Sequence, residues 1–249
     1  MNVAISICPN DIFVFSALLL KNIPNPYNID IYPLGTLNKK ISDNHYDFIK
    51  VSSLALINSS DYFVTRVGAS LAKDKGPQLV KAKGSLPSGS ILGVPSLHAT
   101  ATKLATKYYP NLTAKEFPLN QLSSLTSAGE IPYALIINED MNRLDELNLE
   151  SISDLGLTWN KEFNALLPLG VIGAKNTLSK NNVDEFEQLV NKSIEWAREN
   201  VDKALDLTKK YTGEKNINSD HIKLFTQDAH FNPFIPSYLK KLEDSISPT

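Results

Sequence analysis

The chain has little cysteine, little histidine and no excess of positive charge. Its single cysteine, Cys8, has no partner for an internal disulfide, and one thiol fits a reducing compartment. The formal net charge of −2 argues against nucleic acid or an anionic membrane as a partner, so we expect a small molecule or a protein. The histidines lie too far apart for metal-ligand spacing. They are His45, His98, His221 and His230.

Long apolar runs are also missing, since no uninterrupted run reaches the ~20 residues that a membrane-spanning helix needs. The first apolar stretch, residues 3–7, has no basic segment before it, and Pro9 interrupts it too early for a signal peptide. The sequence therefore predicts a cytoplasmic protein without a membrane partner. Its 249 residues, 42% hydrophobic and 21% charged, suffice for one large or two small globular domains.

Short apolar or alternating runs recur between helical patterns, which predicts an α/β fold. Two of these runs are continuous and apolar, as in buried parallel strands. We expect strands at residues 2–7, 28–34, 46–51, 90–94 and 133–137. We expect helices at residues 12–20, 98–109, 183–197 and 200–207.

Two stretches are typical of boundaries between domains. Residues 83–90 are rich in Gly, Ser and Pro, and a second candidate lies near residues 173–176. These signals predict two α/β lobes, with lobe I formed by residues 1–86 and 174–249 and lobe II, residues 87–173, inserted into it. A cleft between the lobes is the expected ligand site.

The segment Cys8-Pro9-Asn10-Asp11 joins the first strand to the first helix. Pro9 cannot donate a ladder hydrogen bond, so the strand stops there, and Asn10 and Asp11 are predicted N-cap residues. The turn places backbone N–H groups and short polar side chains at the carboxyl end of a strand. Ligands of α/β proteins bind at such ends, although an ordinary turn explains the same residues.

Two further strand ends carry short polar residues. Ser52 and Ser53 follow the strand that ends at Val51, where a simple cap or turn would also place them. Residues 95–102 follow another strand and open a helix, whose first amides predict an anion site. Stabilisation of the helix start by Thr100 is the alternative.

Six segments together carry a resemblance to a known family. They read SICPNDIFVFSAL, KVSSLAL, KDKGPQLV, GVPSLHATA, ALIINED and DLGLTW…LLPLG. In this order the chain resembles the 1,4-dihydroxy-6-naphthoate synthases of the futalosine route to menaquinone, from Ser6 to about Gly170. The resemblance implies a two-lobed fold like that of type II periplasmic binding proteins, in a cytosolic lyase. It implies cleavage of cyclic dehypoxanthinylfutalosine to 1,4-dihydroxy-6-naphthoate and a three-carbon sugar fragment, without metal or organic cofactor.

The resemblance also implies roles for particular residues. It implies substrate contacts for Asn10, Ser52 and Ser53, with Ser52 aligning best. The helix amides near Ala99 and Thr100 would bind the carboxylate of the small-molecule substrate. The family usually has two threonines there.

A third part of the implied site is apolar. The resemblance implies that Trp159 and residues 166–170 form a wall for the naphthoate ring, and a buried structural tryptophan is the equal alternative. Gly76 and Pro77 are expected to shape a loop on the hinge side.

One departure from the family bears on catalysis. Asn138 stands where the family has its proposed catalytic histidine, and asparagine does not titrate near neutral pH. His98 or Asp11 would then supply the base, and a structural role is the alternative for His98. Ile12 also replaces a usual threonine. Glu139, next to Asn138, is expected to cap or to form a salt bridge.

Three interpretations stay open from the sequence. The first is a lyase with another base, and the second is a catalytically impaired small-molecule-binding protein on the same scaffold. The third is a related enzyme such as chorismate dehydratase, although its N-terminal residues usually differ from CPND. A secreted solute-binding protein is a weaker alternative without an export signal. The family tends to form homodimers, and no patch of this sequence indicates one.

Overall fold

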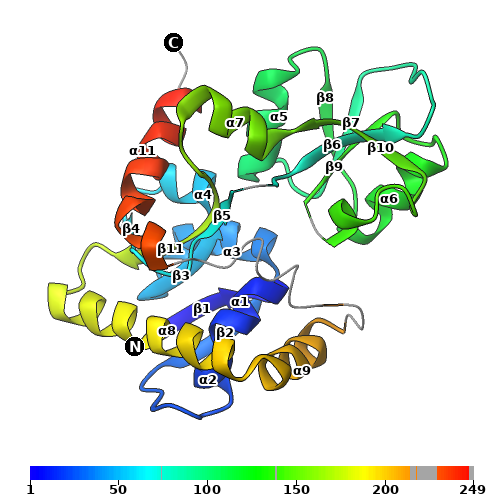
Figure 1. Ribbon diagram of the computed structural model, residues 1–249. Coiled ribbons are helices and arrows are strands. Elements are labelled where there is room, and N and C mark those ends of the chain that lie inside the picture. Colours follow the sequence, from blue (N-terminus) through cyan, green and yellow to red (C-terminus); the bar gives the residue numbers. More distant parts are fainter. Residues whose placement is uncertain (74, 138, 214–216, 218–228, 247–249) are drawn as a thin grey trace. The chain divides into compact units, whose positions relative to one another are not determined.

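The computed structural model describes residues 1–73, 75–137, 139–213, 217 and 229–246, and the chain divides into two units (Figure 1). Unit 1 consists of Met1–Leu71 and Pro168–Lys240, and unit 2 of Ala72–Leu167 and Lys241–Thr249. Each unit is built around its own β-sheet with helices packed on it. The predicted α/β class is therefore confirmed.

The sheet of unit 1 has the strand order β2-β1-β3-β11-β4, and β5 also pairs with β11. Strands β1 and β2 are parallel, as are β1 and β3, while β11 runs antiparallel to β3 and β4. The carboxyl ends of β1, β2 and β3 therefore lie at one edge of the sheet. The strands are β1 (Asn2–Ser6), β2 (Asn28–Tyr32), β3 (Phe48–Ser52), β4 (Tyr62–Val64), β5 (Ser70–Ala72) and β11 (Leu167–Lys175).

The first helix of unit 1, α1 (Pro9–Val14), begins three residues before residue 12, where the sequence predicts its start. Cys8 is its N-cap, and Pro9 occupies the first helical position, where its missing N–H leaves no bond unmade. The predicted N-cap roles of Asn10 and Asp11 are therefore wrong, because both residues lie inside the first turn. The expected single helix at residues 12–20 forms as α1 and α2 (Ser16–Leu19).

Two longer helices cover unit 1 beside α1 and α2 (Figure 1). They are α8 (Lys180–Glu199) and α9 (Val201–Thr212), which confirm the helices expected at residues 183–197 and 200–207. Ser179 caps α8 by accepting a hydrogen bond from the Asn182 amide at 3.2 Å. The other helical segments of this unit are α3 (Leu34–Lys40), η1 (Ile41–Asp43), α4 (Ser53–Ile57) and η3 (Ala229–Phe234), and α11 (Ile235–Ile246) begins in it.

An aromatic cluster fills the core between this sheet and α8. Phe186 of α8 is fully buried and stacks on Phe48 of β3, with ring centroids 3.8 Å apart and an interplanar angle of 9°. Tyr27 packs edge-on against Phe186 at 5.5 Å, and Phe15 lies at 6.4 Å. Phe186 is therefore at the centre of the contact between α8 and the sheet, and Val183, Val190 and Ile194 of the same helix lie in the same cluster.

The sheet of unit 2 has the strand order β10-β6-β9-β7-β8, in which β7 is parallel to β8 and to β9. Its strands are β6 (Gln78–Ala82), β7 (Ile91–Val94), β8 (Thr113–Glu116), β9 (Tyr133–Ile136) and β10 (Leu149–Asp154). Its helical segments are α5 (Thr100–Tyr108), α6 (Leu119–Ser127), η2 (Glu139–Asn142) and α7 (Leu155–Phe163). The parallel pairing expected of the runs at 90–94 and 133–137 is confirmed by β7 and β9.

The predicted lobe boundaries and the divisions between the units fall at different residues. Residues 83–90 connect β6 to β7, and both strands belong to the sheet of unit 2. Residues 173–176 include the end of β11 in unit 1. A stretch rich in Gly, Ser and Pro indicates a loop. This composition is the same for loops within a unit and for loops between units, so it does not locate a boundary between units.

Replacing Phe186 by alanine is expected to lower the free energy of unfolding by about 3–5 kcal/mol, because it empties the centre of the aromatic cluster. Urea denaturation of the wild type and the variant measures this loss. Phe63→Ala is the matched control, since Phe63 is 41% exposed and should cost about 1 kcal/mol or less. Equal losses in the two variants would contradict the assignment of the core.

Candidate functional site

The polar residues predicted in unit 1 lie at neighbouring strand ends. Ser6 ends β1 and leads into the turn that holds Asn10 and Asp11, while Ser52 ends β3 and Ser53 opens α4. Because β1 and β3 are adjacent and parallel, the two strand ends share one edge of the sheet. The structure thus brings these predicted site residues to one edge of unit 1, as the sequence led us to expect.

A buried ion pair holds this edge together. Asp11 Oδ1 lies 2.9 Å from Lys50 Nζ, and the two side chains are only 6% and 3% exposed. The other carboxylate oxygen of Asp11 accepts a hydrogen bond from the Ser6 hydroxyl, which in turn accepts one from the Cys8 amide at 3.1 Å. Both oxygens of the Asp11 carboxylate are therefore engaged by neighbouring side chains.

Two oxygen atoms at this edge are buried without a partner in the described structure. One is Oδ1 of Asn10, and the other is Oγ of Ser53, a residue with no exposed surface. Ser52 behaves differently, since its hydroxyl accepts a hydrogen bond from the Ala55 amide at 3.3 Å and so caps α4. A buried polar atom without a partner costs about 1–3 kcal/mol. Because Asn10 is partly exposed, its Oδ1 suits a hydrogen-bond donor from a ligand.

In unit 2 the corresponding edge is formed by β7 and β9. His98 and Ala99 lie in the turn after β7, and Ala99 is the N-cap of α5, which starts at Thr100. His98 is exposed, whereas Thr100 is 2% exposed. The chain leaves β9 at Ile136 on the same edge, and Asn138 follows but lies outside the described residues, as does the side chain of Glu139.

The first turn of α5 is held by its own loop. The Thr102 hydroxyl donates to the Ser96 carbonyl at 2.7 Å, and the His98 amide donates to the Ser96 hydroxyl at 3.2 Å. No side chain caps this helix, because its N-cap is an alanine. The Ala99 amide donates to the Ser96 carbonyl at 3.3 Å. The positive end of the helix dipole still favours an anion at this point.

Trp159 lies inside α7 with no exposed surface. Its ring packs on Phe163 with centroids 4.1 Å apart, and its indole Nε1 has no partner in the described structure. This burial favours the structural alternative for Trp159 over a contact with a substrate ring. Nearby, burial and a 2.7 Å hydrogen bond to Glu162 raise the pKa of Tyr108.

The Asp154 carboxylate links Gly76 to the start of α7. Asp154 caps α7 by accepting from the Leu157 amide at 2.9 Å, and the same carboxylate accepts from the Gly76 amide at 3.0 Å. Gly76 and Gly156 approach so closely that a Cβ on Gly156 would lie 2.8 Å from Gly76 Cα. Both glycines are needed for this approach, which explains the loop-shaping role expected of Gly76.

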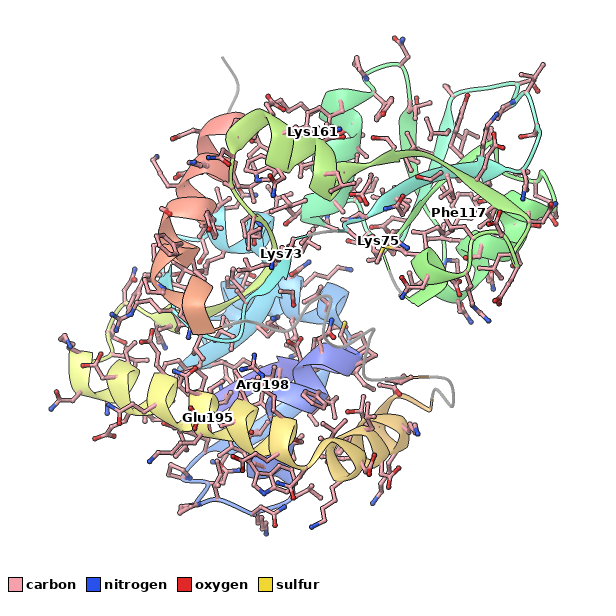
Figure 2. The ribbon with its side chains drawn as sticks, viewed as in Figure 1. Lys73, Lys75, Phe117, Lys161, Glu195 and Arg198 are labelled. Carbon is pink, nitrogen blue, oxygen red and sulfur yellow. The ribbon has the colours of Figure 1, made fainter. Side chains whose placement is uncertain are left out.

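A lysine of the KDKGPQ segment holds the turn that follows β9. Lys75, labelled just before β6 in Figure 2, donates to the Met141 carbonyl and, at 3.1 Å, to Oδ1 of Asn142. Asp140, in the same turn, accepts from the Ser123 hydroxyl of α6 at 2.6 Å. The turn after β9 is therefore held by Lys75, before β6, and by Ser123 of α6.

Lys50 is the residue of the site that the sequence reasoning missed. A signal was present, because Lys50 interrupts the otherwise apolar strand Phe48-Ile49-Lys50-Val51. A charged residue in a strand buried on both faces requires a partner of opposite charge nearby. That partner, Asp11, is distant in sequence, and only the pairing of β1 with β3 brings the two together.

Other chemistries receive no support from the described part of the chain. Within it, no three His, Cys, Asp or Glu side chains are grouped so that they could hold a metal ion. None of the helices described combines the length and the hydropathy required to cross a bilayer.

A family model described as menaquinone biosynthesis matches residues 1–233. The chain belongs to the menaquinone biosynthesis family. Two curated relatives are both named 1,4-dihydroxy-6-naphtoate synthase. The protein from Thermus thermophilus is 28% identical over 86% of this chain and 80% of its own length. The protein from Streptomyces coelicolor is 23% identical over 92% of this chain and 85% of its own length.

Solved structures show the fold of this family member. Protein AF1704 from Archaeoglobus fulgidus has a TM-score of 0.88 at 24% identity, covering 98% of this chain and 95% of its own. The periplasmic aliphatic sulphonate binding protein SsuA from Escherichia coli has a TM-score of 0.68 at 12% identity, covering 98% and 85%. The expected periplasmic-binding-protein-like fold is therefore confirmed.

Gly156→Ala should lower the free energy of unfolding by about 1–3 kcal/mol, because the added methyl group meets the backbone of Gly76. Urea denaturation measures the change. Gly35→Ala in α3 is the matched control, since a Cβ there meets nothing within 4 Å and should stabilise by about 0.5–1 kcal/mol. A Gly156→Ala variant as stable as the wild type would contradict the close contact.

Proposed function

We propose that the protein is a lyase that cleaves cyclic dehypoxanthinylfutalosine to 1,4-dihydroxy-6-naphthoate. The observation that carries this proposal is the family match over residues 1–233, together with two curated relatives of that name. Both relatives align over at least 80% of their own length, so most of their chain is represented here. The fold of small-molecule-binding proteins supports a small-molecule substrate.

Unit 1 would bind the hydroxyl groups of this substrate. Asn10 is partly exposed and its Oδ1 has no partner in the described structure, so a hydroxyl hydrogen from the substrate would satisfy it. Ser53 Oγ also lacks a partner, but it belongs to a residue with no exposed surface. Ser52 would contribute by holding the start of α4. Asp11 already accepts from Ser6 and Lys50, so we assign it to the support of the site and not to proton transfer.

Unit 2 would bind the substrate carboxylate at the first turn of α5. The positive end of the helix dipole and the amides near Ala99 and Thr100 favour a negative charge there. His98, exposed two residues before the helix, would serve as the base that Asn138 cannot supply. Asn138 would orient the substrate through its amide.

A second function, binding without turnover, is favoured by Asn138 itself. Asparagine in place of the family histidine removes the group that the family is proposed to use as its base. Such a protein would bind the same compound and release it unchanged.

The deciding measurement is turnover by the purified wild type. We expect cyclic dehypoxanthinylfutalosine to be converted to 1,4-dihydroxy-6-naphthoate, detected by mass spectrometry. The absence of product from folded protein at high enzyme concentration would contradict the lyase proposal. Calorimetry on the same sample would then distinguish a binding protein, with measurable affinity, from a protein of another function.

His98→Ala should lower kcat by about 100-fold or more, because a positioned general base contributes that much. Lys103→Ala, within α5, is the matched control and should leave kcat unchanged. An unaltered kcat in His98→Ala would show that another group is the base.

Asn138→His separates an impaired enzyme from one adapted to asparagine. A gain of about 100-fold or more in kcat is expected if the site is otherwise intact, since the imidazole restores a titrating base. A loss is expected if the amide makes paired contacts with the substrate. Steady-state kinetics of Asn138→His, alone and combined with His98→Ala, gives the answer.

A further inference from the structure

We propose that Lys50 is a positioning residue that fixes the turn of residues 8–11 for ligand binding. The proposal rests on the function proposed above, in which Asn10 binds the substrate. Lys50 does not bind the substrate in this scheme, because each of its three N–H donors has an acceptor within the protein. It acts through Asp11, the neighbour of Asn10 in the first turn of α1.

The ammonium group of Lys50 has a full set of acceptors. Besides Asp11 Oδ1 at 2.9 Å, it donates to the Gly68 carbonyl at 2.6 Å and to the Ser70 hydroxyl at 3.3 Å. A lysine carries three N–H donors, so each has one acceptor and the geometry of the group is fully specified. One side chain of β3 therefore joins α1, the loop at Gly68 and β5.

The aliphatic part of the Lys50 side chain packs closely against β11. A Cβ on Gly170 of β11 would lie 3.2 Å from Lys50 Cε and 3.7 Å from its Nζ. An added methyl group at Gly170 would therefore require the Lys50 side chain to shift by a few tenths of an ångström. Lys50 thus contacts β5 and β11, the strands in which the chain passes between units, at Leu71–Ala72 and Leu167–Pro168.

Apolar packing holds the later part of α1, where Ile12, Phe13 and Val14 are buried, whereas Lys50 holds its first turn. Helix α1 has six residues and no side chain that caps it. Ser6 reinforces the same connection, since it donates to Asp11 and accepts from the Cys8 amide. The direction of the Asn10 amide therefore depends on the Asp11 carboxylate, whose place is fixed by Lys50. A displaced Asn10 amide would lose its hydrogen bond to the substrate, which weakens binding.

The test is the double variant Lys50→Met/Asp11→Asn, which removes both charges and leaves no buried ion alone. Replacing a whole buried ion pair by neutral side chains is often tolerated, so this variant should fold. We expect KM for cyclic dehypoxanthinylfutalosine to rise about 10-fold or more while kcat falls less than about threefold, because the lost interaction positions a binding group.

The matched control is Arg66→Met/Glu187→Gln in the same unit. This 2.9 Å ion pair joins Arg66, in the loop after β4, to Glu187 of α8. Its removal changes the charges in the same way and should leave KM unchanged. An unchanged KM in Lys50→Met/Asp11→Asn, or an equal rise in the control, overturns the proposal.

Ser70→Ala provides a second test that keeps both charges. It removes one acceptor of Lys50, and we expect KM to rise about threefold, with Ser42→Ala, on the exposed segment η1, unchanged. If the double variant does not fold, an unchanged KM in Ser70→Ala overturns the proposal.

The failure of the lyase function is recognised separately, by the absence of product from the wild type. Lys50 is then judged by the dissociation constant for the same compound, measured by calorimetry. Affinity about 10-fold weaker in the double variant than in the wild type supports the proposal. Equal affinity, or no binding by the wild type, overturns it.

Discussion

The buried ion pair between Lys50 and Asp11 is the interaction on which the candidate site of unit 1 depends. Two charges with 3% and 6% exposed side chains are stable only because each has further hydrogen-bond partners. Breaking such a pair by removing one charge costs about 3–5 kcal/mol. The pair is therefore a strong constraint on where α1 begins, and Asn10 takes its position from that constraint.

In unit 2 the segment before β6 is also held in place, mainly by contacts to its backbone. The carboxylate of Asp154 caps α7 and holds the Gly76 amide, and Gly76 lies against Gly156 with no space for a side chain. Lys75 then holds the turn after β9. In both units a short segment at the edge of the sheet is fixed by an interaction with a segment far away in the sequence. Binding groups on such segments are preorganised before a ligand arrives.

Family membership and the chemistry of the site carry different information. The match over residues 1–233 reflects residues throughout the chain, and a substitution at one position hardly changes it. Catalysis depends on single groups, and Asn138 lacks the titrating nitrogen that the family is proposed to use. The same scaffold is compatible with both turnover and simple binding, because a fold does not by itself fix a function.

The sequence by itself determined the α/β class, the parallel strands at residues 90–94 and 133–137, and the long helices α8 and α9. These elements follow from local apolar patterns, which need no knowledge of distant residues. It also placed Asn10 and Ser53 at strand ends, because a strand end is visible as the limit of an apolar run. Only the tertiary structure decided the partner of Lys50, the burial of Trp159 and the division of the chain into units. Each of these depends on which strands and helices become neighbours, and residues far apart in sequence meet only once the sheets have formed.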